Sequence, residues 1–363
     1  MTRPTHALID RKALRDNFAL AVKSQKGQCM PIVKANAYGH GMDIVCGALD
    51  QTPAFGVASI NEALELRNLG FKQPILLLEG TFDSDEIELA SENNFWLMVE
   101  NHRQKDHILK AKLKQPIRIW LGLDSGMHRL GFDPPETHEV YQHLLNSGKI
   151  DSLTVLATHF ACANDLSNEM TTRQIECFDK TVRGIESATG HILGQSLANS
   201  AAIMGWEKAL RDWQRPGYML YGNSPFYGKQ TSTLLRPVMT LKSEIISLRT
   251  IEAGETVGYD AIWKAERKST IATISIGYGD GYPRRAKNGT PVIIKQQRCP
   301  LVGRVSMDMI TADVTDCDCA QLGDPVILWG PELPVNEVAG YCETNGYELL
   351  SGISTRIPRV GIN

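Results

Sequence analysis

Several familiar signals are missing from this chain of 363 residues. No apolar run approaches the ~18 residues of a membrane span, and residues 1–10 lack the apolar core of an export signal. The eight cysteines form no CxxC or CxxxC pattern with nearby histidines, so we expect no metal site. The formal net charge of −3 offers no basic face for nucleic acid. We therefore expect a cytoplasmic protein with reduced thiols and with no membrane or nucleic-acid partner.

The composition is that of an ordinary globular protein, with 42% hydrophobic and 22% charged residues. The length exceeds what one small core usually organises, so two domains are expected. The first, over residues 9–229, alternates short apolar runs with amphipathic stretches. Its predicted strands are residues 31–35, 54–59, 74–80, 95–100, 117–124, 154–160, 195–200 and 217–222. Its clearest predicted helices are residues 61–70, 83–94, 102–113 and 169–190.

Eight strand–helix alternations over roughly 220 residues predict a (β/α)8 TIM barrel. Ser59 followed by Glu62 predicts a capping box at the start of the helix at residues 61–70. A doubly wound sheet is the alternative, and it needs a glycine fingerprint after the first strand. The segment KANAYG at residues 34–39 is not such a fingerprint, so the barrel is favoured.

The sequence changes character after residue 229. Short β-rich runs at residues 270–276, 291–295, 309–314 and 325–329 are separated by glycine, proline and aspartate. One helical pattern follows at residues 335–344. We therefore expect a mostly-β C-terminal domain over residues 230–363, joined to the barrel by the polar segment 230–236. Residues 1–8 are expected to pack with this second domain.

Lys34 follows the first apolar run and precedes several small residues. Barrel enzymes place their reacting groups at the C-terminal ends of the strands, where this lysine is expected to lie. A partly desolvated lysine in that place can act as a neutral amine and form a Schiff base. The alternative is an ordinary strand-end lysine that points into water.

Other predicted strand ends carry polar or cationic residues as well. Arg129 lies just after the fifth strand and His159 closes the sixth. Taken singly, each has an ordinary explanation, as a surface cation and as a core histidine. Together they predict a site for an anionic cofactor and an anionic substrate. Backbone N–H groups near Ser200, Gly217 and Tyr218 suit a phosphate, since barrel phosphate sites often use the last two strands.

Four blocks in the chain resemble those of alanine racemases, the barrel-type enzymes that use pyridoxal 5′-phosphate (PLP). The first is VKANAYGHG at residues 33–41, which looks like the cofactor-lysine signature of that family. The others, in order, are RPG and LYG at residues 215–222, YGDG at 278–281 and GRVSMD at 303–308. The resemblance covers essentially the whole chain, and the four blocks at family-like spacing make it specific.

The resemblance implies an isomerase that binds PLP and interconverts L- and D-alanine, so supplying D-alanine for peptidoglycan. Lys34 and Tyr259 would be the two catalytic bases, with Tyr259 contributed by the partner subunit of a homodimer. The implied cofactor-binding residues are Lys34, Tyr38, His159, Ser200, Arg215, Gly217 and Tyr218. The implied substrate-binding residues are Arg129, Met307 and Tyr278.

This assignment is chemically coherent. Two bases on opposite faces can remove the α-proton from one side and return a proton to the other. Tyrosine is a weak base at its reference pKa of ~10, so a chain from Arg215 through His159 is expected to lower the pKa of Tyr259. Arg215 would face the pyridine nitrogen, and it cannot readily donate a proton. The nitrogen would then stay unprotonated, which limits transamination as a side reaction.

Two positions depart from the family pattern. Gly122 replaces a lysine whose modified side chain, in many relatives, supports the carboxylate-binding arginine. We expect the gap to be filled by a small anion, chloride first, or else by a carboxylate or amide from a nearby strand, with water alone third. Thr355 replaces a phosphate-binding tyrosine of some relatives, which leaves cofactor affinity open.

Three other functions compete with racemisation. A barrel-type amino-acid decarboxylase would share the lysine but needs an acidic partner for the pyridine nitrogen where this chain has Arg215. A non-catalytic PLP carrier would resemble a lone barrel, without the β domain and Tyr259. A nucleotide loop around Asp280 is disfavoured because Pro283, not a helical pattern, follows it.

Overall fold

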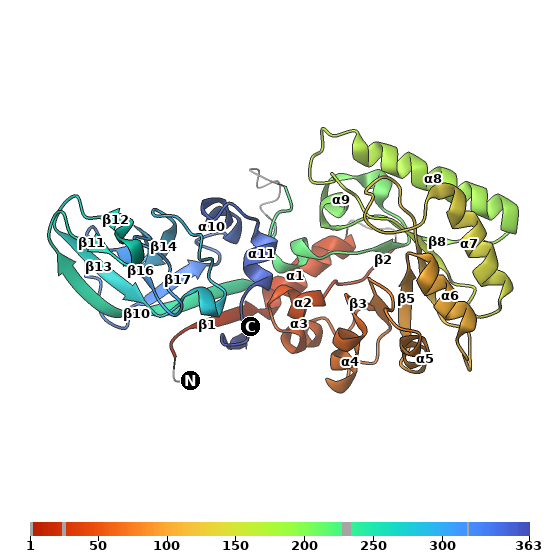
Figure 1. The fold of residues 1–363 in the computed structure, drawn as a ribbon, viewed down its shortest axis with the longest axis horizontal. Coiled ribbons are helices and arrows are strands. Elements are labelled where there is room, and N and C mark those ends of the chain that lie inside the picture. The colour runs from red at the N-terminus through yellow and green to blue at the C-terminus, as the bar shows by residue number, and fades with distance from the viewer. Residues whose placement is uncertain (1–2, 24–26, 227–233, 318) are drawn as a thin grey trace.

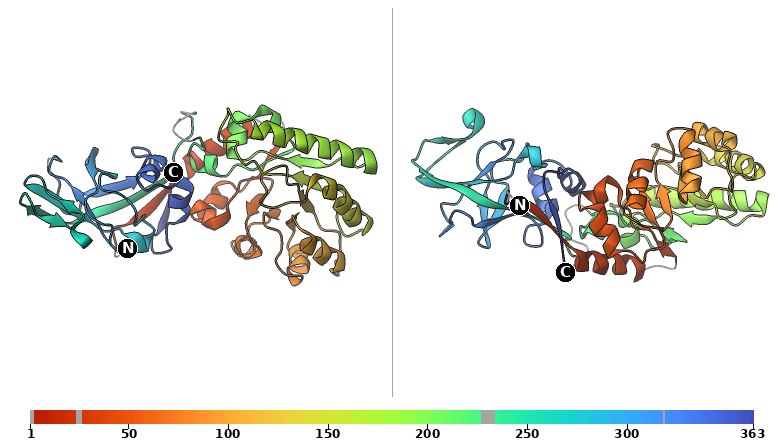
Figure 2. Two further views of the ribbon diagram at one scale, coloured as in Figure 1. Left: turned by 45° about the horizontal axis from the view of Figure 1, so that its top comes forward. Right: turned by 90° about the horizontal axis from the view of Figure 1, so that it is seen from below.

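The computed structural model describes residues 3–23, 27–226, 234–317 and 319–363. Two lobes lie end to end along the long axis of the molecule (Figure 1), and they remain distinct from two other directions (Figure 2). One lobe is a β/α barrel, and the other is a mostly-β domain. The expected boundary between residues 229 and 230 lies outside the described residues.

The strands of the first lobe form a ring, which confirms the predicted barrel. Six parallel strands follow one another in order: β3 (Phe55–Val57), β4 (Ile75–Leu77), β5 (Phe95–Val99), β6 (Ile119–Gly122), β7 (Val155–Ala157) and β8 (Gly194–Ser196). A second parallel pair, β2 (Gln28–Cys29) and β9 (Trp213–Gln214), completes the set. Single bridges join this pair to β3 and to the chain after β8, at Ile32–Gly56 and Asn199–Arg215.

Helices follow the strands along the chain, and the four clearest sequence patterns are confirmed within a few residues. The barrel helices are α1 (Arg11–Lys23), α2 (Lys34–Tyr38), α3 (Met42–Ala48), α4 (Ile60–Asn68), α5 (Asp85–Glu92), α6 (His102–Lys110), α7 (Pro134–Asn146), α8 (Met170–Thr189) and α9 (Ser200–Gly205). The predicted capping box is wrong, because the helix starts where expected but the two side chains do not make the capping hydrogen bonds. Ser59 is the N-cap of α4 but makes no side-chain cap bond. Glu62 instead accepts from the backbone N–H groups of Ala58 and Ala35, both at 2.7 Å.

Two of the predicted strands are wrong. Lys34 begins the short helix α2, and the backbone from Ala35 to Tyr38 has positive φ angles near 50°. Residues 218–221 form the short 3₁₀ helix η2 (Tyr218–Tyr221) rather than the eighth strand, which lies earlier as β9. A short apolar run fits a buried strand and a buried helix equally well, so pattern alone could not separate them.

The barrel interior is filled below its mouth by apolar side chains. The buried members of this interior cluster are Met30, Ile32, Ala54, Leu76, Trp96, Met98, Trp120, Val155 and Ala157. The interior is therefore a packed core, and the largest pocket found among the described residues lies above this cluster, at the C-terminal ends of the strands.

The β domain is built on one long strand, β10 (Met239–Ile251), which pairs with β1 (His6–Asp10), β13 (Ser269–Ile274) and β17 (Pro325–Trp329). The N-terminal strand β1 thus lies in the C-terminal sheet, beside β10 (Figure 1). The predicted β-runs and the predicted helix are confirmed. The remaining elements are β11 (Thr256–Val257), η3 (Tyr259–Ala261), β12 (Trp263–Lys264), η4 (Tyr278–Asp280), β14 (Pro291–Ile294), β15 (Gln297–Pro300), β16 (Ile310–Asp313), α10 (Val335–Tyr341), α11 (Gly346–Ser351) and β18 (Arg359–Ile362).

No helix in the described part of the chain is both long enough and apolar enough to cross a membrane.

Candidate functional site

A cavity of about 850 Å³ opens at the mouth of the barrel, above the apolar interior. Its walls come from the loops after the strands and from α11 of the β domain. Eight residues singled out from the sequence line it: Lys34, Tyr38, Arg129, His159, Ser200, Arg215, Gly217 and Tyr218. Residues separated by up to 184 positions in the chain therefore meet in one space, as barrel enzymes require.

Side-chain alternation explains why several of these residues point into the cavity. Along a strand, side chains two residues apart share a face. Three residues of the cavity wall each lie two positions after an apolar residue. That apolar residue either belongs to the interior cluster or packs against it. The pairs are Ile32 and Lys34, Ala157 and His159, and Trp213 and Arg215.

Lys34 is half-buried in the cavity wall, at the start of a tight left-handed turn. The turn is held from both sides. The Glu62 carboxylate accepts from the Ala35 N–H at 2.7 Å, and the Asn36 side chain accepts from the Met42 N–H at 2.8 Å. These bonds fix the backbone that carries Lys34, so the amine is presented from a defined point.

One end of the cavity has hydroxyl groups and backbone N–H groups close together. The Ser200 Oγ accepts from the N–H groups of Gly217 and Met219, at 3.0 and 3.2 Å. A Cβ atom on Gly217 would stand 2.8 Å from the Tyr38 hydroxyl, so glycine is required for this close approach. Burial raises the pKa of Tyr38 to about 12, which keeps its hydroxyl a donor. Hydroxyl donors beside backbone amides fit a phosphate group.

Arg215 is buried and fully engaged by the barrel wall. Its guanidinium donates to the Thr158 carbonyl at 2.5 Å, to the Leu197 carbonyl at 3.3 Å and to the Ser196 hydroxyl. Burial lowers the pKa of Arg215 to about 10, with the Glu100 carboxylate opposing this, so the side chain remains a cation at neutral pH.

The expected bond from Arg215 to His159 is not present. His159 faces the same cavity, but the donors of Arg215 go to the barrel wall instead. Enclosure in the barrel mouth, together with the nearby cations Arg215, Arg129 and Lys34, lowers the pKa of His159 to about 3. The imidazole is therefore neutral, and the positive charge in this part of the site belongs to the arginines.

Arg129 lies on the loop that follows β6, and the base of that loop is well fixed. The Asp124 carboxylate accepts from the N–H groups of Gly126 and His128, at 2.9 and 3.0 Å. The Phe132 N–H donates to the Gly122 carbonyl at 2.9 Å and closes the loop. The exposed guanidinium of Arg129 is thus carried at the cavity rim by an ordered loop.

Three of the expected residues do not reach this cavity. Tyr259, Tyr278 and Met307 all belong to the β domain, with exposed fractions of 68%, 36% and 55%. Strands β11 and β12, which flank Tyr259 in the chain, lie in the outer part of that domain, away from the barrel (Figure 1). A single chain therefore assembles the barrel part of the expected site but not the β-domain part.

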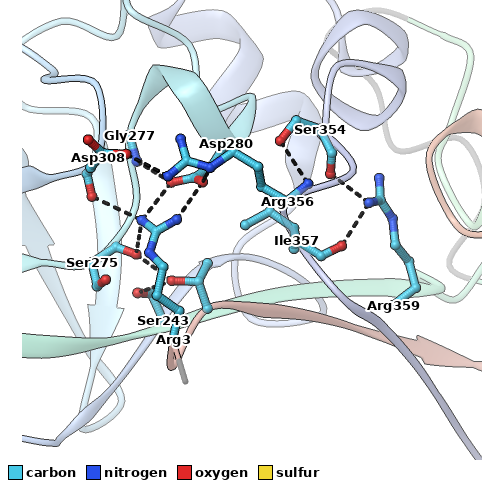
Figure 3. Close-up of polar contacts among 11 residues, drawn as sticks. Arg3, Ser243, Ser275, Gly277, Asp280, Asp308, Ser354, Arg356, Ile357 and Arg359 are labelled. Carbon is cyan, nitrogen blue, oxygen red and sulfur yellow. Dashed lines mark hydrogen bonds and ion pairs between the residues drawn. The ribbon is translucent and has the colours of Figure 1, made fainter. Parts of the chain in front are cut away.

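A buried charge cluster fixes the loops that carry Tyr278 and Met307 (Figure 3). The fully buried Asp280 carboxylate accepts two bonds from Arg3, at 2.7 and 2.9 Å, and pairs with the Arg356 Nε at 3.4 Å. The Tyr278 N–H donates to the Ser306 carbonyl, at 3.0 Å, which ties the two loops together. The Asp280 carboxylate is thus occupied by bonds to arginines of its own chain. This disagrees with the alternative in which the loop around Asp280 binds a nucleotide.

Several residues of the cavity wall were missed from the sequence. They are Glu79, Glu100, Asn164, Asn199, Asn345 and Tyr347. Alternation from Met98 could have found Glu100. Tyr347, on α11, stacks on Tyr218 with 3.7 Å between ring centroids, and no local signal marks it. Thr355 is exposed and does not line the cavity.

The family models of the alanine racemase N-terminal and C-terminal domains match residues 9–225 and 238–361. The catabolic alanine racemase of Pseudomonas putida is 44% identical over 98% of both chains. The alanine racemase of Chromohalobacter salexigens is 45% identical over 99% of this chain and 98% of its own. The crystal structure of biosynthetic alanine racemase from Pseudomonas aeruginosa covers 100% of both chains at 44% identity, with a TM-score of 0.94. The chain belongs to the alanine racemase family, whose members are isomerases that use pyridoxal phosphate.

Proposed function

We propose that this protein interconverts L- and D-alanine with PLP bound in the barrel cavity, and that Lys34 and Tyr259 exchange the α-proton from opposite faces. The observation that carries the proposal is the cavity itself. It brings Lys34, Arg129 and Arg215 together above a packed barrel interior, although they are far apart in the chain. A basic amine in one cavity with two cations suits an anionic amino acid and an anionic cofactor.

The residues of the cavity fit PLP at both ends. The hydroxyls of Tyr38 and Ser200, with the backbone at Gly217 and Tyr218, would hold the phosphate. Arg215 would face the pyridine nitrogen, since its guanidinium is held rigidly in the wall of the same cavity. Lys34 would attach to the cofactor, because its half-buried amine opens into this space.

When bound, PLP withdraws electrons from the α-carbon of the substrate and so acidifies the α-hydrogen. Arg129 binds the substrate carboxylate at the rim and fixes the direction of the α-hydrogen. The Lys34 amine takes or returns the proton on one face, and the Tyr259 hydroxyl does so on the other. His159, held neutral, adds no positive charge to the site.

Arg215 favours racemisation over decarboxylation. A decarboxylase gains from an acidic partner at the pyridine nitrogen, which strengthens electron withdrawal. Arg215 is held in place by carbonyl acceptors and keeps its own proton at neutral pH, so it cannot protonate the ring. The site is therefore suited to brief removal of the α-proton and its return.

The working enzyme is proposed to be a homodimer. Tyr259, Tyr278 and Met307 are exposed on the β domain and do not line the cavity of their own chain. A two-fold pairing would bring the β domain of each subunit over the barrel mouth of the other. Since the reaction runs both ways, the same site serves D-alanine supply for peptidoglycan and D-alanine breakdown.

Exchange of solvent deuterium into alanine tests the activity. The purified protein with PLP should convert either enantiomer to the racemate and replace the α-hydrogen by deuterium, as seen by NMR and chiral chromatography. Release of carbon dioxide would indicate a decarboxylase. Binding of PLP without exchange would indicate a carrier.

A further inference from the structure

Glu100 and Gly122 are neighbours at the top of the barrel interior. Strands β5 and β6 pair in parallel with Val99 opposite Leu121, so the following residues on the two strands face each other. Side-chain alternation then sends both positions inward. Glu100 and Gly122 accordingly line the cavity.

The missing side chain at Gly122 makes room for Glu100. A Cβ atom on Gly122 would stand 2.9 Å from the Glu100 Cγ and 3.4 Å from its Oε1. The first distance is shorter than carbon atoms tolerate, so any larger residue would displace the glutamate. The space beside Gly122 is therefore taken by a glutamate from the adjacent strand, the second of the three occupants expected from the sequence.

The Glu100 carboxylate has no hydrogen-bond donor among the residues that the structure describes. Only its backbone N–H is bonded, to the Gln104 side chain at 2.8 Å. Burial raises the pKa of Glu100 to about 7, while the Arg129 charge acts in the opposite direction. The charged and titratable groups around it are Lys34 after β2, Glu79 after β4, Asp124 and Arg129 after β6, His159 after β7 and Arg215 after β9. A carboxylate without donors is costly to enclose, so its place near two arginines requires a reason.

Among the nearby charges, that of Arg129 has the largest influence on the pKa of Glu100. The loop of Arg129 is closed on the carbonyl of Gly122, so Glu100 and Arg129 are both anchored at this one position. Within the described residues, no carboxylate lies within 4 Å of the Arg129 guanidinium. Arg215, in contrast, is already held by the barrel wall.

We propose that Glu100 is the positioning residue for Arg129 in the racemase reaction, and that Gly122 is the position that permits it. The anionic carboxylate attracts the exposed guanidinium toward the cavity and limits the poses in which it meets the substrate carboxylate. This inference rests on the proposed substrate-binding role of Arg129. It needs no bound halide beside Gly122.

The test compares Glu100→Gln with Glu139→Gln in the holoenzyme, because Glu139 is an exposed carboxylate on α7 that lies outside the cavity. Glu100→Gln should raise KM for alanine about fivefold with less than about twofold change in kcat, the scale of one charge interaction partly open to solvent. Propionate, which offers only the carboxylate, should bind more weakly by the same factor in calorimetry. Glu139→Gln should change neither value by more than about twofold.

Two further variants keep the negative charge of Glu100 but change its position. Gly122→Ala should displace Glu100 and raise KM, but it should add little in the Glu100→Gln background, because both changes remove the same interaction. Glu100→Asp, which keeps the charge on a shorter side chain, should lie between Glu100→Gln and the wild type.

The pH dependence of stability and of KM tests whether Glu100 positions Arg129 or stabilises the fold. Since the folded-state pKa of Glu100 is raised, its ionisation destabilises the fold as pH rises through about 7. Glu100→Gln should therefore gain thermal stability relative to wild type at pH 8, and the gain should shrink as pH falls from about 7 and vanish below about 4.5. The wild-type KM should rise as pH falls below about 7, and this dependence should be absent from Glu100→Gln.

Three results would overturn the inference. One is an unchanged KM in Glu100→Gln when Arg129→Ala raises KM strongly; the proposed function would then survive and only the role of Glu100 would fail. Another is a loss of stability at pH 8, which would make Glu100 a structural residue. The third is a KM that changes when chloride is replaced by a bulky anion, which would place a halide beside Gly122. An unchanged KM in Arg129→Ala would instead contradict the proposed function.

Discussion

The barrel and the β domain present the residues of the proposed site in opposite ways. In the barrel, Lys34, His159 and Arg215 turn inward and share one cavity. In the β domain, Tyr259 and Met307 turn outward, and more than half of each side chain is exposed. The barrel thus offers an enclosed half of a site, whereas the β domain offers an exposed half with ordered loops behind it.

This difference determines where the surroundings of each proposed base come from. A half-buried amine such as Lys34 can be tuned by its own chain, because the groups around it are already in place. An exposed tyrosine such as Tyr259 acquires its environment only when another surface covers it. The following predictions test whether the two halves are unequal in the way the structure implies.

The largest effect is expected from the barrel half. Lys34→Ala should abolish racemisation by at least about 10⁴-fold, since it removes both the cofactor attachment and one base. Borohydride reduction followed by peptide mass spectrometry should find PLP on Lys34 in the wild type and on no lysine in the variant. PLP attached to a different lysine in active protein would contradict the assignment.

A large but one-sided effect is expected from the β-domain half. Tyr259→Phe should reduce racemisation by about 10²–10⁴-fold, the usual range for loss of one acid–base group. Because Lys34 remains, exchange of the α-hydrogen should persist for one enantiomer, which we expect to be D-alanine. Deuterium uptake into each enantiomer measures this, and an equal loss for both would mean that the bases are not face-specific.

Mixing the two inactive variants tests whether the halves come from different chains. Random pairing makes half of the dimers hybrids, and each hybrid has one intact site out of two, so about a quarter of wild-type activity should return. Subunit exchange should be verified independently, by differently tagged chains. Without recovery in verified hybrids, each site would have to be built within one chain.

Features with a local sequence pattern could be predicted, whereas features that depend on contacts between distant segments could not. The β/α alternation predicted the barrel. The family blocks contain Lys34, Tyr38, Arg215, Gly217 and Tyr218, and the predicted strand ends added Arg129, His159 and Ser200. Glu100 was missed because its role depends on the register between β5 and β6, which places it beside Gly122. The strand predicted at residues 217–222 is instead η2, because a short apolar run has no decisive period. Cross-strand contacts and long-range ion pairs have no local pattern and required the structure.

The contact between Arg3 and Asp280 is the clearest long-range case, and it gives the smallest of the expected effects. These residues are 277 positions apart, yet the Asp280 carboxylate is fully buried and accepts two bonds from Arg3 (Figure 3). Because the arginines around it remain partly open to water, Asp280→Asn should lower the free energy of unfolding by only about 1.5–3 kcal/mol, the worth of hydrogen bonds to a charged group.

The functional consequence of Asp280→Asn should follow from the loops that this carboxylate fixes. Its Oδ2 also accepts from the Gly277 N–H at 3.0 Å, directly before Tyr278. Looser loops should raise KM for alanine by about two- to threefold while kcat stays near wild type, since neither base is moved within its own domain. Asp316→Asn is the matched control, because its pair with Arg267 lies in the same domain but is exposed, and it should cost less than about 1 kcal/mol. Urea unfolding of both variants measures the loss of stability, and steady-state kinetics measures the change in KM and kcat. If Asp280→Asn proved no less stable than Asp316→Asn, the buried cluster would not be what orders the exposed half of the site.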